Sequence, residues 1–262
     1  VLIVNGFEGP IDLEISDTAL RIGFDVSGDT RRSFTIKSTT GLNVKPVDGY
    51  TGNLIELADN SFETITIEGL TIRDAESAAI DGLPFNGYAG TTETTLRIQN
   101  SRFLNNGPDV SPGGAIQTYS NVEIIDSIFS NNFGSAVRAF SDVSVSGSLF
   151  IDNVAIDQGG QVYGGAISSG IGNVYSVNST YLDNKAYGAG AIHSQFGDIQ
   201  LALNTFSGNE SSFWGASIGG GSGVTMWGNI FVGQGGVEVF SDGFEADLGY
   251  NLADSDLDSF TA

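Results

Sequence analysis

Two basic side chains occupy equivalent outward positions in a phrase that the sequence repeats. Arg138 and His193 each follow the aliphatic residue that ends a small-small-aliphatic phrase. If each repeat forms one layer of a parallel sheet, the two side chains lie two layers apart, at about 9 to 10 Å. A basic residue that removes a proton beside a sugar carboxylate, with calcium bound to that carboxylate, is the chemistry of a polysaccharide lyase. An isolated Arg and a lone His are also common on a solvated sheet surface, so both interpretations stay open.

Acidic residues recur at a second repeated position, directly before a column of asparagines. This position holds Asp74, Asn105, Asn131, Asp152, Asp183 and Gly208. Asp152 and Asp183 come from consecutive layers and could share a calcium ion with backbone carbonyl oxygens. Asp and Asn also stabilise turns through hydrogen bonds to their own backbone. We therefore expect no required cofactor and consider calcium the ion that this pair would bind.

Aromatic side chains gather in segments where the shorter repeats have no residues. They are Phe85, Tyr88, Tyr163, Tyr187, Phe213 and Trp214. Aromatic rings beside acidic side chains suit stacking on a sugar face combined with recognition of its hydroxyl groups. The best single candidate is the phrase ESSFWG, which contains Phe213 and Trp214, and Tyr163 and Tyr187 complete the expected ligand-binding set. Loop aromatics can instead fold back over the side of the protein.

Other reaction types find less support in the sequence. A nucleophilic triad needs a His beside a Ser and a carboxylate, but the chain has one His, no Cys and no Gly-x-Ser-x-Gly elbow. A glycoside hydrolase needs only two carboxylates about 5 to 10 Å apart. The 31 acidic residues meet that condition too easily for the sequence to test it. A binding module is therefore the preferred interpretation, and an enzyme, a lyase or a hydrolase, is the alternative.

The composition describes a folded and strongly acidic chain. Hydrophobic residues make up 40% of the 262 residues, enough to bury a core, and the formal net charge is -21. Such a charge repels nucleic acid phosphates and anionic lipid, so neither is an expected partner. The sequence has no apolar run of the roughly 20 residues that a transmembrane helix needs.

Three columns of residues recur when the repeats are aligned. An aromatic column holds Ile72, Phe103, Phe129, Phe150, Tyr181, Phe206 and Phe231. Three residues later stands a column of Ala75, Asn106, Asn132, Asn153, Asn184, Asn209 and Gln234. The aliphatic column holds Ile80, Ile116, Val137, Ile167, Ile192, Ile218 and Val239. The aromatic residues recur at intervals of 21 to 31 residues, each after a short run of alternating apolar and polar residues that is typical of a strand.

Repeats of this length, with short strands and no helical periodicity, predict an all-β fold: a single-stranded, right-handed parallel β-helix of about nine coils. The aromatic and aliphatic columns would fill the core, and the Asn residues would adopt the left-handed conformation and hydrogen-bond along the axis. We expect one domain over residues 1–262, with less regular first coils at 1–62, regular coils at 63–240 and a terminal segment at 241–262. Insertions are expected at Asp81–Thr94 and Val154–Tyr163.

Several phrases resemble those of a known group of proteins. NSTYLDNKAYGAGAI and NTFSGNESSFWGASI are similar to the coils of bacterial right-handed β-helix surface proteins, including polymorphic outer-membrane proteins with their Gly-Gly-Ala-Ile and Phe-x-x-Asn motifs. The end of the chain, with its Gly-Tyr-Asn-Leu phrase, is similar to the closing coil of secreted choice-of-anchor β-helix proteins. The resemblance covers roughly Ile65 to Asp254, and its motif consists of packing residues.

The resemblance implies a secreted or bacterial cell-surface protein that acts in adhesion or carbohydrate binding. Its expected partner is a polysaccharide or a ligand on a host or neighbouring cell, and the chain is expected to be a monomeric module of a longer protein. Pectate-lyase-like enzymes share the architecture, which keeps the polysaccharide lyase with Arg138 and His193 as the alternative.

Overall fold

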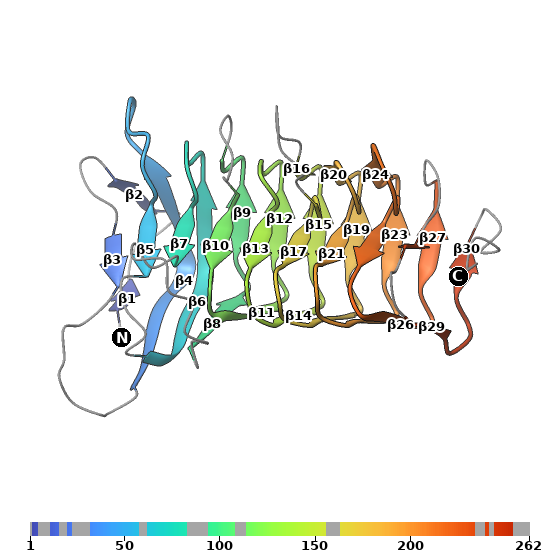
Figure 1. Ribbon diagram of the computed structural model, residues 1–262. Helices are drawn as coiled ribbons and strands as arrows, with labels where there is room; N and C mark the ends of the chain where they lie inside the picture. Colours follow the sequence, from blue (N-terminus) through green and yellow to red (C-terminus); the bar gives the residue numbers. More distant parts are fainter. Residues whose placement is uncertain are drawn as a thin grey trace.

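The computed structural model consists of β-strands joined by turns, and no helix occurs in the part of the chain that it describes (Figure 1). The described residues are 2–4, 11–15, 20–22, 32–57, 62–82, 94–107, 114–155, 163–233, 239–240 and 244–253. The strands stack along one axis, from β1 (Leu2–Val4) near the amino end to β30 (Leu252–Ala253) at the carboxyl end (Figure 1). The prediction of an all-β fold with parallel strands is confirmed.

Sheet A contains 18 strands, including two long ones near its amino-terminal end, β4 (Arg32–Pro46) and β6 (Phe62–Arg73), which pair in parallel. Strands β1 and β2 (Ile11–Ile15) both pair with β4. After β6, two shorter strands replace each long one, so the sheet continues as two ladders. Ladder A1 comprises β8 (Thr95–Gln99), β11 (Asn121–Ile125), β14 (Val143–Ser146), β18 (Val174–Val177), β22 (Ile199–Ala202), β26 (Gly223–Trp227) and β29 (Phe244–Asp247). Ladder A2 comprises β9 (Arg102–Leu104), β12 (Ile128–Ser130), β15 (Leu149–Ile151), β19 (Thr180–Leu182), β23 (Thr205–Ser207), β27 (Ile230–Val232) and β30.

Two further sheets are present, sheet B with nine strands and sheet C with three. Sheet B contains β3 (Leu20–Ile22), β5 (Ile55–Leu57), β7 (Ile80–Gly82), β10 (Ile116–Thr118), β13 (Val137–Ala139), β17 (Ile167–Ser169), β21 (Ile192–Ser194), β25 (Ile218–Gly220) and β28 (Val239–Phe240). Sheet C contains β16 (Val154–Ala155), β20 (Lys185–Ala186) and β24 (Glu210–Ser211). Along the chain, strands of A1, A2 and B follow one another, and each pairs with its equivalent one repeat away. This arrangement is consistent with a parallel β-solenoid.

The predicted aromatic column forms the centre of the core. Its fully buried rings, which face inward from ladder A2, belong to Phe103, Phe129, Phe150, Tyr181, Phe206 and Phe231. Consecutive ring centroids lie 4.8 to 5.1 Å apart with planes within 8° of parallel. This distance follows from the strand spacing of about 4.8 Å, so the backbone register holds the rings in contact.

The asparagine column forms a hydrogen-bonded ladder, as predicted. Asn153 is fully buried; its Nδ2 donates to Asn184 Oδ1 at 2.9 Å and to the Phe129 carbonyl at 3.0 Å. Its Oδ1 accepts from the backbone nitrogen and the Nδ2 of Asn132, at 3.1 and 2.8 Å. Both ends of the buried amide are therefore satisfied by the neighbouring layers and by the core strand.

The left-handed conformation lies one residue earlier than predicted. The ladder asparagines are not among the residues with positive φ; instead the preceding residues are, namely Asp74, Asn105, Asn131, Asp152, Asp183 and Gly208, with φ between 52° and 61°. The prediction was wrong because a ladder Asn must direct its amide along the axis, and the residue before it makes the turn. Asp152 and Asp183 therefore have a structural role at this corner, since Asp and Asn tolerate the left-handed region.

A second polar ladder, which was not predicted, runs along the corner between A1 and A2. Its members are Ser101, Ser127, Ser148, Ser179, Asn204, Asn229 and Asn251. The backbone nitrogen of Ser127 donates to Ser148 Oγ at 3.1 Å, and that of Asn204 donates to Asn229 Oδ1 at 2.9 Å. These residues stand two positions before the aromatic column, a spacing that the sequence displays.

Some predictions fall outside the described residues. They concern Phe85, Tyr88, Gln234, most of the two insertions and the end of the terminal segment.

Candidate functional site

The four aromatic residues predicted to bind ligand come together with His193 in one cluster. The aromatic cluster consists of Tyr163, Tyr187, His193, Phe213 and Trp214. Tyr187 directly follows β20 and Phe213 follows β24, while Tyr163 forms an isolated parallel bridge with Gly188. The cluster is thus assembled from consecutive layers at the connection from sheet C to sheet B.

Two stacked ring pairs form the cluster. Tyr163 and Trp214 stack with centroids 5.3 Å apart, and so do Tyr187 and Phe213. The pairs meet edge to face where Tyr163 and Tyr187 lie 6.1 Å apart. Phe213 is 67% exposed, whereas the other three aromatic rings are half-buried. The Tyr187–Phe213 pair therefore contains the ring of the cluster that is most exposed to solvent.

Two glycines make room for the Trp214 ring. A Cβ atom at Gly219 would overlap Trp214 Cζ3, and one at Gly188 would lie 2.8 Å from Tyr163 Cδ1 and 3.1 Å from Trp214 Cε2. In the register of sheet B, Gly219 stands beside His193 on the next strand. The Trp214 ring therefore packs closely against sheet B at Gly219, so part of the cluster does fold back over the side of the protein.

His193 lies beneath these rings. Its imidazole stacks on Tyr163 at 4.7 Å, its centroid is 5.8 Å from that of Trp214, and the residue is only 6% exposed. Burial lowers the pKa of His193 to about 4, because the charged form would lose its hydration. Nδ1 has no hydrogen-bond partner among the described residues. His193 is thus neutral near pH 7, and the interpretation of it as a solvated surface residue was wrong.

Arg138 lies on the same sheet, as the sequence predicted. In the register of sheet B, Arg138 pairs with Ser168, and Ser168 pairs with His193, so the two basic residues are two strands apart. Arg138 is half-buried. The stacked Tyr163 ring and the neighbouring Trp214 bury His193, which limits the access of a bound sugar to its imidazole.

The two acidic residues proposed to bind calcium are exposed and lie on adjacent layers. Ile151 pairs with Leu182, so Asp152 and Asp183 follow at equivalent corners. The side chain of Lys185 already supplies a positive charge next to these corners. Its Nζ is 2.9 Å from Glu210 Oε2. The pKa of Lys185 is raised mainly by Glu210 and to a smaller extent by Asp183 and Asp152. Among the described residues, no group of three or more acidic or His side chains is arranged to hold a metal ion.

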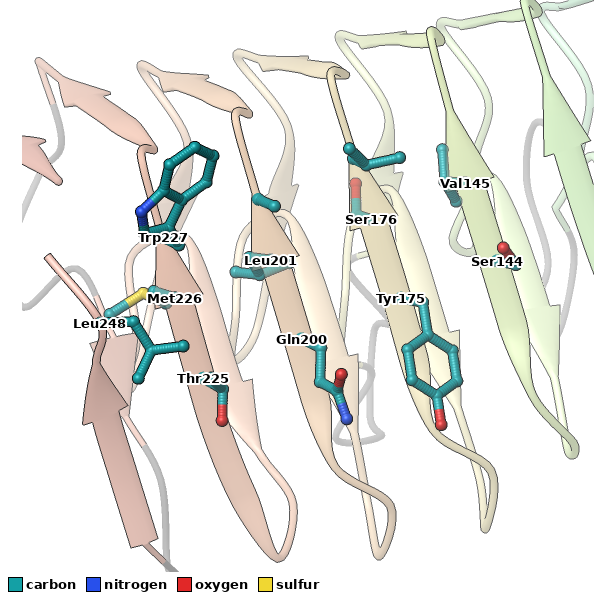
Figure 2. A pocket seen from close by; sticks show the side chains of 12 residues that line it. Ser144, Val145, Tyr175, Ser176, Gln200, Leu201, Thr225, Met226, Trp227 and Leu248 are labelled. Carbon is teal, nitrogen blue, oxygen red and sulfur yellow. The ribbon is translucent and has the colours of Figure 1, made fainter. Parts of the chain in front are cut away.

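A groove on the outer surface of ladder A1 was not predicted. Figure 2 shows its side chains on successive strands, with Tyr175, Gln200 and Thr225 in one row and Trp227 beyond Thr225 on β26. The groove has a volume of about 300 Å³ and extends from Ser144 to Leu248. The sequence did carry a signal: outward positions of the runs VYSVN and VTMWG hold aromatic residues, where a half-buried strand normally places small or polar ones.

Comparison with known protein families, curated proteins and solved structures finds no match to this chain. Within its described residues, no helix is both long and apolar enough to cross a membrane.

Proposed function

We propose that this chain is an extracellular or cell-surface module, a right-handed β-solenoid of about nine coils, that binds carbohydrate in adhesion or ligand capture. The nine strands of sheet B support the coil number if each coil supplies one. The strong preference of parallel crossovers for the right hand supports the handedness. The resemblance to bacterial surface proteins is the basis for the proposed location and for a glycan on a host or neighbouring cell as partner.

The observation that carries the binding function is the stacked pair of Tyr187 and Phe213. An aromatic ring that is 67% exposed yet held against a second ring is a rigid apolar surface in contact with water. A sugar ring has an apolar face of C–H groups that can cover such a surface, and its hydroxyl groups can reach neighbouring polar side chains. Glu210, which is exposed on β24 three residues before Phe213, pairs with Lys185 through Oε2, and its carboxylate can also accept hydrogen bonds from sugar hydroxyl groups.

The two tryptophans of the chain allow this cluster to be tested separately. In a Trp227→Phe background, Trp214 is the only tryptophan, and its emission should shift to shorter wavelength as a glycan covers the cluster. We expect Tyr187→Ala and Phe213→Ala each to weaken binding roughly tenfold. Phe196→Ala is the matched control because Phe196 is also exposed, at 62%, but lies outside the cluster. Equal binding by all three variants would contradict the proposal.

A polysaccharide lyase or glycoside hydrolase of the pectate-lyase-like type is the second candidate, favoured by the register of Arg138 and the neutral His193 on one sheet. Incubation with acidic and neutral polysaccharides in the presence of calcium distinguishes the two functions. Unsaturated uronate absorbance or new reducing ends that disappear in Arg138→Ala or His193→Gln would establish the enzyme. Binding without turnover supports the module.

A further inference from the structure

The outer surface of ladder A1 changes along the stack. One outward row runs in register through Arg97, Glu123, Ser144, Tyr175, Gln200 and Thr225. Its first two members form an ion pair, with Arg97 Nε 2.7 Å from Glu123 Oε2. The twelve described residues that line the groove include no charged side chain. In a chain with a net charge of -21, this surface is a neutral region.

The floor of the groove cannot accept an additional strand. Strand β18 pairs with β14 on one side and β22 on the other, and β22 pairs in turn with β26. The backbone N–H and C=O groups of these strands are therefore used within the sheet. A ligand must be recognised by side chains alone, which excludes an extended peptide that binds by strand addition.

The exposed side chains combine aromatic surfaces with uncharged hydrogen-bonding groups. Tyr175 is 37% exposed and Trp227 is 41% exposed, and they lie two strands apart, about 10 Å across the sheet. The amide of Gln200 and the hydroxyl of Thr225 stand between or beside them in the same groove (Figure 2). Such a surface fits a ligand with an apolar face and a hydroxylated edge.

We propose that this groove is a second binding site, specific for neutral oligosaccharides. The lining offers no Lys or Arg to pair with a uronate or sulfate, and no carboxylate to pair with a cation, among its twelve described residues. An acyl chain does not suit this groove, because it would cover the polar side chains of Ser144, Gln200 and Thr225 and remove their hydrogen bonds to water. The strand spacing of about 4.8 Å is close to the length of one pyranose residue, so successive strands can each meet one sugar of a chain that runs along the stack.

This site does not rest on the aromatic cluster. The groove lies on ladder A1 and the cluster lies over sheet B, and each contains one of the two tryptophans. Either site can fail to bind without affecting the conclusion on the other.

The test uses the whole chain with Trp214→Phe, so that Trp227 is the only tryptophan. Cellohexaose, xylohexaose and mannohexaose serve as neutral probes and hexagalacturonic acid as the acidic one, with Trp227 emission as the readout because it reports the groove and not the aromatic cluster. We expect saturable binding of at least one neutral probe with a shift of Trp227 emission to shorter wavelength, and at least tenfold weaker binding of the acidic probe.

Two substitutions locate the binding. Tyr175→Ala and Gln200→Ala are expected to weaken binding of the neutral probe roughly tenfold each. The matched controls are Phe196→Ala and Gln195→Ala, at exposed positions outside the groove. The proposal is overturned if no neutral probe binds, if the acidic probe binds equally well, or if the groove variants bind like the controls. Unfolding curves of each variant verify that a loss of binding is not a loss of fold.

Discussion

The inside and the outside of this stack follow different rules although they belong to the same strands. Inside, every layer repeats one set of contacts, with aromatic rings 4.8 to 5.1 Å apart from Phe103 to Phe231. Outside, consecutive layers of one row present Glu123, Ser144 and Tyr175. The repeat is therefore a property of packing, and the outward residues that we propose bind ligand are those that depart from it.

The largest loss of stability is expected from a substitution in the aromatic column of the core. Phe150→Ala would leave a cavity between the rings of Phe129 and Tyr181, which lie 4.9 and 5.1 Å from the Phe150 ring. We expect a loss of about 3 to 5 kcal/mol in the free energy of unfolding. Denaturant unfolding followed by circular dichroism measures it. An unchanged midpoint would show that the aromatic column does not carry the core.

The next largest loss of stability is expected from a substitution in the asparagine ladder. Asn153→Ala removes an amide that makes hydrogen bonds to Asn132, Asn184 and the Phe129 carbonyl, and leaves buried partners without them. The expected loss is about 2 to 4 kcal/mol. Asn131→Ala, at the exposed corner position beside it, is the comparison and should cost less. Equal losses would mean that the corner conformation matters more than the ladder.

His193 is an outward residue that is buried by other outward residues. Because its pKa falls from 6.5 to about 4 on folding, the unfolded chain binds more protons between these two values. The stability that neutral His193 provides is thus complete above about pH 6.5 and is lost as the pH falls toward 4, by up to about 3 kcal/mol. Unfolding measured at pH 7 and pH 4 should show a larger decrease for the wild-type chain than for His193→Gln. Equal decreases would contradict a buried imidazole.

A substitution at Leu203 is expected to change the stability by less, and to raise it. It occupies the left-handed corner position, at a φ of 58°, that Asn100 and Asn178 occupy in other layers. Leucine is disfavoured there by about 1 to 2 kcal/mol, and asparagine less so. Leu203→Asn should therefore stabilise the fold by about 1 kcal/mol in thermal unfolding. Ile171→Asn, an exposed position outside the positive-φ group, is the control that should show no gain.

The smallest effect concerns calcium at Asp152 and Asp183. Millimolar calcium should raise the melting temperature slightly more than sodium chloride of equal ionic strength does, because an ion bound only by the folded chain stabilises it. Asp183→Asn should lose part of this increment and keep the fold, since Asn131 occupies the equivalent corner. Asp198→Asn, at another exposed position, should keep the whole increment. Equal shifts with both salts would indicate screening alone.

The interior could be predicted from the sequence because each layer of a parallel stack places a residue against its own equivalent. A column such as Phe129, Phe150 and Tyr181 is therefore visible without coordinates. The left-handed corner residue was predicted one position too late in the sequence. The alternation of apolar and polar residues does not show which of two adjacent polar residues, such as Asp152 and Asn153, makes the turn.

The outside could be predicted only in part. Differences in repeat length pointed to the segments that carry Tyr187 and Phe213, and these residues do stack. The burial of His193 could not be predicted, because it depends on the stacked Tyr163 ring and on Trp214, which packs against Gly219 on the neighbouring strand. The groove depends on the register that places Tyr175, Gln200 and Thr225 on adjacent strands, which becomes clear only once the strands are aligned.

The most direct test of the account is calorimetric titration of the whole chain with a panel of neutral and acidic oligosaccharides, for the Trp227→Phe parent chain and for the double variant Tyr187→Ala, Phe213→Ala in the same background. We predict that the parent chain binds at least one saccharide and that the double variant binds it at least tenfold more weakly. The free energies of unfolding of the two chains should agree within about 0.5 kcal/mol. A parent chain that binds no saccharide, or a double variant that binds as tightly as the parent, would contradict a binding function carried by the outward aromatic residues.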